Sequence, residues 1–265
     1  MPGKSYRGEL IPLTIQEKII QDNLRKDIIK LGSQIGIRNS GNYENLNNAV
    51  KFLESSFQKS GYKVNKQEYK INNQIFTNLE VEIKGITKPD EIIIIGGHYD
   101  TAFNSPGAND NASGAATVLE LARKFAEQKP SRTLRFVEFT NEEPPYFWTE
   151  NMGSLVYAKA CKQRNENILA MLSLETMGYF SQKENSQKYP FPLNLIYPSK
   201  GNFIGFVGNI NSSQLVKNIV GSFRGTTKFP SEGVAMYSKI PGVGWLKGRR
   251  YSLKSLICKA DNILW

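Results

Sequence analysis

The sequence contains one histidine, and it stands where a buried strand is expected to end. His98 follows the run Glu91-Ile92-Ile93-Ile94-Ile95-Gly96-Gly97, and Asp100 comes shortly after it. An unbroken run of isoleucines that stops at glycines is typical of a strand buried on both faces. Ligands of open α/β sheets bind outside the carboxyl ends of the strands. Because a lone histidine is more often an ordinary loop residue, its role depends on which residues stand at the ends of the other strands.

Acidic side chains come directly after two other expected strands. The strand expected over 134–140 runs into Glu142 and Glu143, and the strand expected over 168–174 ends at Glu175. Parallel strands bring their carboxyl ends to one edge of a sheet. We therefore expect the histidine and these carboxylates, which are far apart in the sequence, to meet in space.

A further acid, Asp110, stands in the glycine-rich stretch 107–114, which opens a helix. Carboxylates that are clustered at a buried edge repel one another, and a bound cation relieves that repulsion. One histidine with several carboxylates suits zinc, or manganese or cobalt in its place. The sequence therefore predicts a metal-assisted reaction at this edge of the sheet.

Each of these residues also has a simpler interpretation. Asp110 is compatible with a helix N-cap, Asp100 with the cap of a turn, and Glu175 with an ordinary ion pair. The pair Glu142-Glu143 is compatible with a solvated acidic turn. The stretch 107–114 has the glycines of a phosphate cradle, but it carries an acid and lacks a lysine. The metal site is favoured by the joint placement of these residues at strand ends and not by any single one.

Composition excludes several classes of protein. The chain has 265 residues, 40% of them apolar, which is enough for one large core. Its two cysteines, Cys161 and Cys258, exclude a disulfide framework and a cysteine-rich zinc module. No apolar run approaches the roughly 20 residues of a membrane span. Residues 1–13 lack the hydrophobic region of a signal peptide, so we expect a cytoplasmic protein, or an exported or membrane-anchored one if the N-terminus is incomplete.

The net charge of +10 brings nucleic acid into consideration as a partner. The basic residues are spread along the chain, and the densest group lies in the last twenty residues. We therefore expect no nucleic-acid binding.

Strands that alternate with helices predict an α/β fold with a mostly parallel sheet covered on both faces. The first helix begins with a capping box, Thr14 and Glu17, and the first two strands form a hairpin at a sheet edge. We expect helices over 14–31, 46–57, 115–125, 152–163 and 212–223, and strands over 62–71, 75–84, 91–96, 134–140, 168–174, 193–197 and 203–207.

Four motifs in chain order carry a resemblance to a known family. They are His98-Tyr99-Asp100, Gly107-Ala108-Asn109-Asp110-Asn111-Ala112-Ser113-Gly114, Asn141-Glu142-Glu143 and Leu174-Glu175. They resemble the zinc aminopeptidases of the aminopeptidase Y and bacterial leucyl aminopeptidase type, metallopeptidase family 28, whose fold glutaminyl cyclases share. The resemblance implies a three-layer α/β/α sandwich around a mixed sheet, and peptide substrates with a free N-terminus.

The resemblance also implies two zinc ions that Asp110 bridges. His98 and Glu175 would complete one zinc site, and Glu143 would belong to the other. A cis peptide bond would come after Asp110.

For catalysis, the resemblance implies that Glu142 is the general base and that Asp100 orients His98. Such a base takes a proton from a metal-activated water and passes it to the leaving amine. Adjacent glutamates at a bend can point in different directions, which a base next to a ligand requires.

The chain departs from this family near its C-terminus. Family members carry a second histidine ligand after a segment that resembles Ile240–Trp245, and here residues 246–265 contain none. We expect a C-terminally incomplete zinc peptidase domain over 1–245 and a non-matching basic tail over 246–265 that contributes no strand. The second zinc site should then be weak, and activity impaired or absent, unless Asp261 or Cys258 replaces the ligand.

Two other functions stay open. A glutaminyl-cyclase-like acyltransferase would use a single zinc ion, so metal stoichiometry separates it from a two-zinc aminopeptidase. A catalytically dead pseudo-enzyme or basic binding module would instead bind nucleic acid in a salt-dependent way without metal.

Overall fold

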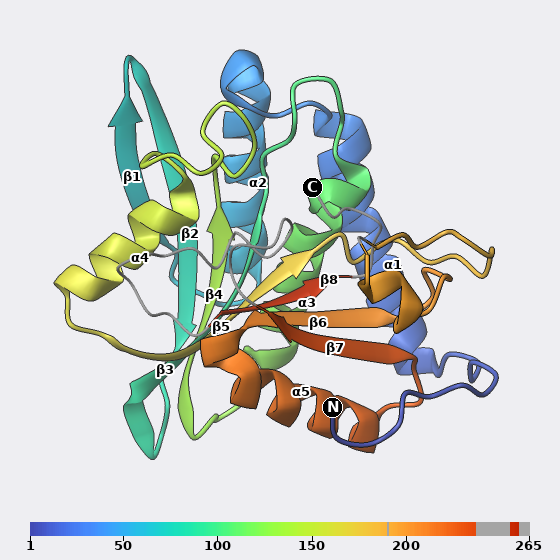
Figure 1. Cartoon of the computed structure of the whole chain (residues 1–265). Helices are drawn as coiled ribbons and strands as arrows, with labels where there is room; N and C mark the ends of the chain where they lie inside the picture. Colours follow the sequence, from blue (N-terminus) through green and yellow to red (C-terminus); the bar gives the residue numbers. More distant parts are fainter. Residues whose placement is uncertain (190, 237–254, 260–265) are drawn as a thin grey trace.

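The strands of this computed structural model, which describes residues 1–189, 191–236 and 255–259, form one mixed sheet in the order β1-β2-β4-β3-β5-β8-β6-β7 (Figure 1). Neighbours β4, β3, β5 and β8 run parallel, and so do β6 and β7. The pairs β1–β2, β2–β4 and β6–β8 are antiparallel. The strands are β1 (Asn65–Ile71), β2 (Gln74–Ile83), β3 (Lys88–His98), β4 (Arg132–Phe139), β5 (Asn167–Glu175), β6 (Ile204–Asn209), β7 (Ser231–Met236) and β8 (Ser255–Lys259).

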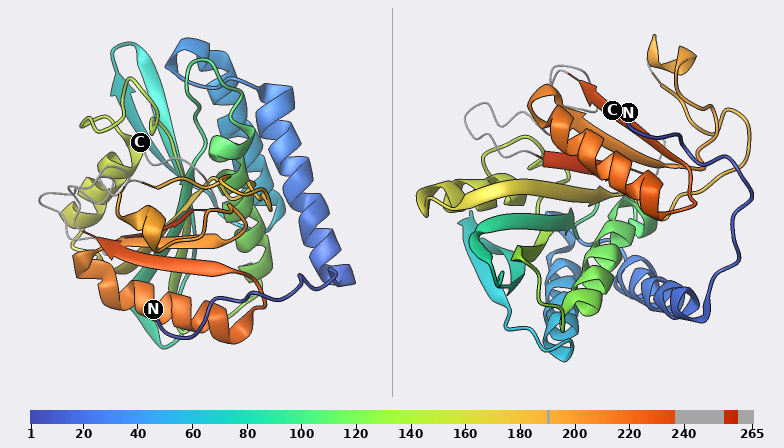
Figure 2. Two further views of the ribbon diagram at one scale, coloured as in Figure 1. Left: turned by 45° about the vertical axis from the view of Figure 1, so that its right-hand side comes forward. Right: turned by 90° about the horizontal axis from the view of Figure 1, so that it is seen from below.

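Helices cover the two faces of this sheet. They are α1 (Ile15–Ile29), α2 (Tyr43–Lys59), α3 (Gly114–Phe125), α4 (Gly153–Gln163) and α5 (Ser213–Thr226). Figures 1 and 2 show α1, α2 and α3 side by side against one face, with α5 along β6 and β7. The N-terminal segment runs beside α5, where Arg224 donates hydrogen bonds to the carbonyls of Pro2 and Gly3 (Figure 2).

The isoleucines of β3 show why this strand lies at the centre. Ile93 and Ile95 pack into the apolar cluster that α2 and α3 share, whereas Ile92 and Ile94 pack into a second cluster with Tyr157 of α4. A strand whose successive side chains are buried on opposite faces must be covered on both sides. The predicted three-layer α/β/α sandwich around a mixed sheet is therefore confirmed.

The expected strand over 193–197 is wrong. Leu193–Leu195 forms a short 3-10 helix, and Leu195 and Ile196 are 73% and 71% exposed. The alternation of apolar residues there resembles a strand, but Pro192 and Pro198 flank it. Because proline has no backbone N–H to donate to a sheet ladder, a segment closed by prolines pairs poorly.

The expectation that residues 246–265 contribute no strand is also wrong. Ser255–Lys259 forms β8, which lies between β5 and β6 and extends the sheet. A short apolar run gains a hydrogen-bonded neighbour on both sides in this position. The rest of that segment lies outside the described residues, so the boundary at 245 stays a prediction.

Helix α1 buries less than its apolar spacing predicts. Its capping box is present, with Glu17 N bonded to Thr14 Oγ1 and the Glu17 carboxylate bonded to Thr14 N. However, Ile15 and Ile19 are 76% and 54% exposed, and Asp27 is the residue of this helix that is buried. The helix contacts the molecule mainly through its second half, where Asp27 accepts a hydrogen bond from Arg123 of α3.

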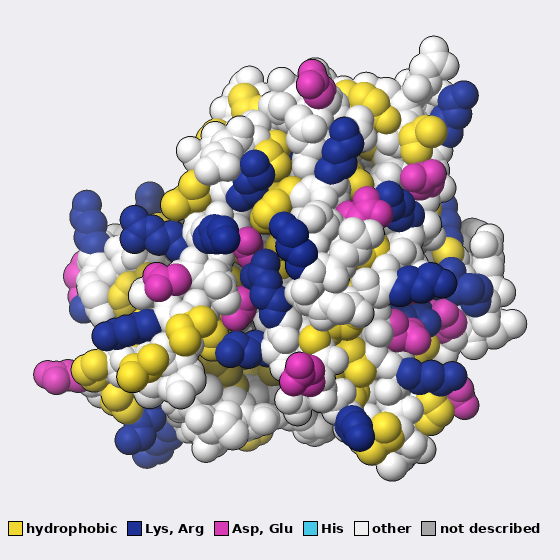
Figure 3. Space-filling model, turned by 180° about the vertical axis from the view of Figure 1, so that it is seen from behind, with side chains coloured by type: hydrophobic (Ala, Val, Ile, Leu, Met, Phe, Trp, Pro, Cys, Tyr) yellow, Lys and Arg dark blue, Asp and Glu magenta, His cyan; other side chains and the backbone are white. Residues whose placement is uncertain are grey.

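The basic residues do not gather on the back face of the molecule. Figure 3 shows Lys and Arg scattered over this face, with Asp and Glu between them. Within the part of the chain that the structure describes, no helix has the length and hydropathy that crossing a membrane requires.

Candidate metal centre

The six residues singled out in the sequence come together at one edge of the sheet. His98 and Glu175 are the last residues of β3 and β5. Glu142 and Glu143 come after the end of β4, and Tyr99 N donates to Phe139 O, which extends the β3–β4 pairing beyond His98. Asp110 and Asp100 enter from the segment between β3 and α3. The parallel order β4-β3-β5 therefore places these side chains at the same edge, as expected.

Three carboxylates surround one nitrogen of the histidine. His98 Nε2 lies 3.1 Å from Asp110 Oδ1, 3.4 Å from Glu142 Oε2 and 3.5 Å from Glu175 Oε2. The imidazole is 2% exposed. Ser173 Oγ donates to the other oxygen of Glu175 at 3.1 Å, which leaves Oε2 directed at the histidine.

Two overlapping groups of donor atoms result. One contains His98, Asp110 and Glu175, and the other contains His98, Glu142 and Glu143, each with one ligand atom per residue within 4.8 Å of the others. The first group is the zinc site that the resemblance implies. The second group places both Glu142 and Glu143 near the histidine. Geometry alone therefore does not show which glutamate is the general base and which is the zinc ligand.

Asp100 holds the bend that carries the two glutamates. Its Oδ1 accepts a hydrogen bond from Glu142 N at 3.1 Å, and its Oδ2 accepts one from Glu143 N at 3.0 Å. The same Oδ1 lies 3.3 Å from His98 Nδ1. One buried carboxylate thus fixes the histidine and both glutamates relative to one another.

Asn111 is a site residue that sequence reasoning missed. Its buried Nδ2 donates to Leu174 O at 2.8 Å, and its Oδ1 accepts from Thr176 N at 3.1 Å and Gly114 N at 3.0 Å. These bonds clasp the backbone on both sides of Glu175. The peptide bond between Asp110 and Asn111 is cis, as the resemblance implies. The position next to Asp110 was the available signal, because a polar residue buried in a loop needs partners.

The start of α3 has room for glycine alone. A Cβ at Gly114 would lie 2.2 Å from Leu174 O and 2.3 Å from Asn111 Oδ1. Contacts under 3.0 Å do not occur for real side chains. The absence of a side chain lets α3 approach β5 closely, which brings Asp110 to Glu175.

Burial and mutual repulsion make the carboxyl groups of Glu142 and Glu143 hard to ionise. Burial raises the pKa of Glu142 well above its usual range, although His98 opposes the shift. Burial likewise raises the pKa of Glu143 to about 7. Burial alone would lower the pKa of His98, but Glu142 and Glu175 raise it well above its usual value. Each of these shifts shows a site in which negative charge is not balanced.

The donor set fits a zinc ion. Across residues 1–189 and 191–236, no lysine or arginine forms an ion pair with Glu142, Glu143 or Glu175. Glu142 Oε1 is buried without a hydrogen bond partner among the same residues. A cation of high charge would neutralise this cluster, and imidazole with carboxylates is a common zinc ligand set.

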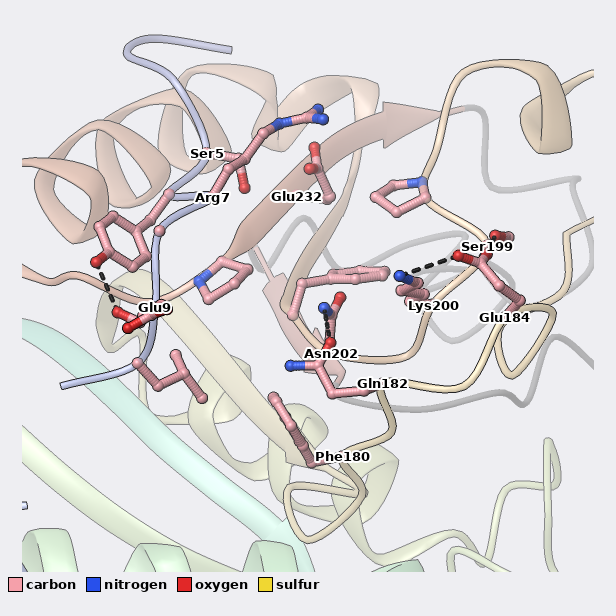
Figure 4. A pocket seen from close by; sticks show the side chains of 16 residues that line it. Ser5, Arg7, Glu9, Phe180, Gln182, Glu184, Ser199, Lys200, Asn202 and Glu232 are labelled. Atoms are coloured by element: carbon pink, nitrogen blue, oxygen red, sulfur yellow. Dashed lines mark hydrogen bonds and ion pairs between the residues drawn. The ribbon is translucent and has the colours of Figure 1, made fainter. Parts of the chain in front are cut away.

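A separate hollow lies away from this cluster (Figure 4). It is a cavity of about 620 Å³ between the N-terminal segment, the loop between β5 and β6, and the start of β7. Its polar side chains mostly bond to one another, as when Lys200 pairs with Glu184 at 2.9 Å and Asn202 donates to Gln182. None of the six predicted site residues lines it, so it is separate from the cluster around His98.

Comparison with known families decides the identity of the fold and of the metal. The sequence pattern of peptidase family M28 matches residues 78–222, more than half of the chain and the part that holds every residue of the cluster. The chain belongs to peptidase family M28. By family this M28 protein is a zinc metallopeptidase, a hydrolase, and zinc is the metal of its family.

Relatives in sequence extend beyond the matched region. The uncharacterized protein YfbL of Escherichia coli (strain K12) is 32% identical over 236 residues, which cover 84% of this chain and 70% of YfbL. A probable zinc metalloprotease of Pyrenophora tritici-repentis is 35% identical over 127 residues, which cover 45% of this chain and 28% of that protein. The M28 chain thus spans much of one relative and a minor part of the other.

Solved structures share the fold of the M28 chain. A leucine aminopeptidase precursor from Bacteroides thetaiotaomicron aligns with a TM-score of 0.62 at 17% identity, over 92% of this chain and 87% of that one. A glutaminyl cyclase from the same organism aligns with a TM-score of 0.61 at 18% identity, over 89% and 83%. At such identities these structures show the zinc exopeptidase-like fold and not the reaction.

Proposed function

We propose that this M28 protein is an aminopeptidase, which hydrolyses the first peptide bond of peptides with a free N-terminus. One observation carries the proposal: carboxylates from three separate segments lie within 3.5 Å of the Nε2 atom of the single histidine. His98, Asp110 and Glu175 would hold one zinc ion. Bound zinc activates a water molecule and polarises the scissile carbonyl.

Glu142 is the residue we assign as general base. It is buried beside the proposed zinc ligands, and burial raises its pKa well above its usual range, which favours a group that can hold a proton during the reaction. A base of this kind accepts a proton from the attacking water and returns it to the leaving amine. Asp100 supports this role, because its hydrogen bond to Glu142 N fixes the bend from which the side chain extends.

The second zinc site is incomplete in our assignment. Asp110 and Glu143 are its two ligands, whereas catalytic zinc usually has three protein ligands. The chain has no second histidine. Cys258 stands in β8 opposite Leu174, and Asp261 lies outside the described residues. We propose that this site binds zinc weakly, which slows the aminopeptidase reaction.

A second candidate is a glutaminyl-cyclase-like acyltransfer, in which an N-terminal glutamine cyclises. The observation that favours it is the complete donor group of His98, Asp110 and Glu175, which can hold a single ion without Glu143. Glutaminyl cyclases also appear among the structures that share this fold. This reaction needs one metal site, and the group of His98, Asp110 and Glu175 would meet that need.

The test combines metal content with turnover. Purified protein is loaded with zinc, and the bound metal is counted while a panel of aminoacyl anilides and a peptide with N-terminal glutamine are offered as substrates. Anilide hydrolysis that Glu142→Gln abolishes would support the aminopeptidase, and cyclisation with one zinc per chain would support the second candidate. A zinc-loaded chain that turns over neither substrate would be a pseudo-enzyme. A chain that retains no zinc would contradict the proposal.

A further inference from the structure

Among the residues whose burial the structure describes, Arg38 heads the fully buried side chains by volume, and none of the roles assigned above uses it. It lies in the turn between α1 and α2 and is 0% exposed. Burying a guanidinium is costly unless its hydrogen bonds are satisfied. Burial indeed lowers the pKa of Arg38 to about 10, while Asp100, Glu138 and Asp110 oppose the shift. What this group holds in place therefore matters.

The guanidinium joins the two ends of the loop between the histidine and Asp110. Its Nε donates to Tyr99 O at 2.5 Å, next to His98 and Asp100. At the other end, Nη1 donates to Pro106 O at 2.7 Å, and Nη2 donates to Gly107 O at 3.1 Å. One planar group thus spans the seven residues between Tyr99 and Gly107.

Gly107 passes this constraint on to Asp110. Its φ of +57° is left-handed, and a Cβ there would lie 2.3 Å from Asp110 O. The Gly107 carbonyl that Arg38 holds also accepts a hydrogen bond from Ala112 N, at the far side of Asp110. The turn that carries Asp110 is therefore fixed to the guanidinium through one carbonyl.

Further hydrogen bonds tie the segment around Arg38 to Thr101 and Ala102. Thr101 N donates to Arg38 O at 3.0 Å, and Arg38 N donates to Thr101 Oγ1 at 3.1 Å. Asn39 Nδ2 adds hydrogen bonds to the carbonyls of Thr101 and Ala102. The guanidinium is in turn anchored to its own segment, because Nη1 also donates to Leu31 O and Gly36 O.

We propose that Arg38 is a positioning residue, which sets the distance between the His98 and Asp110 ligands by bridging the backbone carbonyls of Tyr99, Pro106 and Gly107. The inference rests on the metal centre of the proposed function. The proposal predicts that the shape of the guanidinium matters and not only its charge. A lysine would keep the charge but offers a single nitrogen, which cannot reach both ends of the loop in one plane.

Co²⁺ binding tests the proposal without depending on turnover. The wild-type protein, Arg38→Lys and Arg38→Gln are titrated with Co²⁺, and the visible absorption bands report ligand geometry while the titration gives the Kd. We expect both variants to bind Co²⁺ about 10–100-fold more weakly, as when a partner of a metal ligand is lost, and with altered bands. Arg135→Lys is the matched control, because Arg135 is a buried arginine of the same molecule that pairs with Glu82 and Glu166. It should change thermal stability and leave the Co²⁺ titration unaltered.

A second variant covers the case in which Arg38 substitutions do not fold. Asn39→Asp keeps the oxygen that accepts from Gly41 N and Asn42 N but loses the donor to the Thr101 and Ala102 carbonyls. We expect a folded protein whose Co²⁺ affinity is lowered severalfold.

The outcomes separate this inference from the proposed function. Wild-type Co²⁺ affinity and bands in Arg38→Lys, or in folded Asn39→Asp, would overturn the positioning role alone. A loss of affinity in Arg135→Lys equal to that in Arg38→Lys would overturn it too, because general destabilisation would then explain both. A wild-type protein that binds no Co²⁺ would overturn the proposed function together with the positioning role.

Discussion

The sheet carries two groups of acids, and they differ in what neutralises them. In the middle of β4, Arg135 Nη1 and Nη2 bind the two oxygens of Glu166 at 2.8 and 2.9 Å, and Nε binds Glu82 at 2.6 Å. At the end of the same strand, Glu142 and Glu143 share one histidine with Asp110 and Glu175. The first group is an ion-pair network, and the second has more carboxylates than the protein balances.

The carboxyl pKa values reflect this difference. Burial alone would raise the pKa of Glu166, but the hydrogen bonds from Arg135 and Arg164 lower it to about 2. The pKa of Glu143 is raised by burial to about 7, with further carboxylates adding to the shift. Paired acids stabilise the fold by themselves. Where carboxylates outnumber the cations beside them, as around His98, a cation from solution would stabilise them, and such a cluster is a candidate functional site.

Among these substitutions, replacing Arg135 should lower the stability of the fold the most. Arg135→Met removes the buried guanidinium that pairs with the exposed Glu82 and the half-buried Glu166. Glu166 still pairs with Arg164. Losing hydrogen bonds to charged groups costs about 1.5–3 kcal/mol. Urea unfolding should show this loss, and zinc affinity in the folded variant should stay the same. An unchanged free energy of unfolding would mean that the Arg135 network, like the cluster around His98, does not stabilise the fold by itself.

Replacing His98 should weaken zinc binding and leave the stability of the fold nearly unchanged. Both donor groups contain His98, so His98→Gln should lower zinc affinity by more than the roughly 10–100-fold typical of losing an indirect partner. The metal-free protein should keep most of its stability, because the buried carboxylates can protonate. Isothermal titration with zinc measures the first effect, and thermal unfolding in a chelator measures the second. A variant that binds zinc as the wild type does would remove the histidine from the site.

Asn111 should act on the metal through Glu175. Asn111→Ala loses the hydrogen bonds to Leu174 O and Thr176 N, so Glu175 is held less firmly. We expect a zinc affinity about 10-fold lower, at the small end of the range for such partners. Asn209→Ala serves as the control, since Asn209 caps the turn after β6 and touches no site residue. Equal losses in both variants would contradict a specific role for Asn111.

The smallest expected effect is a pH dependence of the paired group. Because the pKa of folded Glu166 is lowered to about 2, its contribution to stability is present above its unfolded pKa near 4.5 and is lost as the pH falls toward 2. The unfolding free energy of the wild type should therefore decline over this window more steeply than that of Glu166→Gln. Parallel profiles would show that the Arg135 network does not stabilise the fold.

Much of the site could be predicted because its residues stand at the ends of buried strands. The run before His98 and the apolar residues before Glu175 mark strand ends, and the parallel rule brings such ends together. The hydrogen bonds of Arg38 and Asn111 could not be predicted in this way. Asn111 clasps Leu174 and Thr176, about sixty residues away in sequence, and no local pattern encodes that contact.

Edge elements were harder to predict for a different reason. Strand β7 reads Ser-Glu-Gly-Val-Ala-Met, which lacks the apolar alternation of a typical strand. It forms because β6 pairs with it in parallel and α5 packs against it, with Val220 close to Gly233. Its formation therefore depends on tertiary context and not on its own sequence pattern. Residues 193–197 show the opposite case. Their apolar alternation is typical of a strand, but they form a short 3-10 helix because no strand in the described part of the chain pairs with them.

The most direct test of the account is to locate zinc in the molecule. Crystals of the zinc-loaded protein measured on both sides of the zinc absorption edge would show the ion as an anomalous difference peak. We predict a strong peak bonded to His98 Nε2, Asp110 and Glu175 at about 2.0–2.2 Å, the usual zinc–ligand distances. A weaker second peak is expected beside Glu143. No peak at the end of β3, or a zinc ion bound elsewhere with His98 free, would contradict the account.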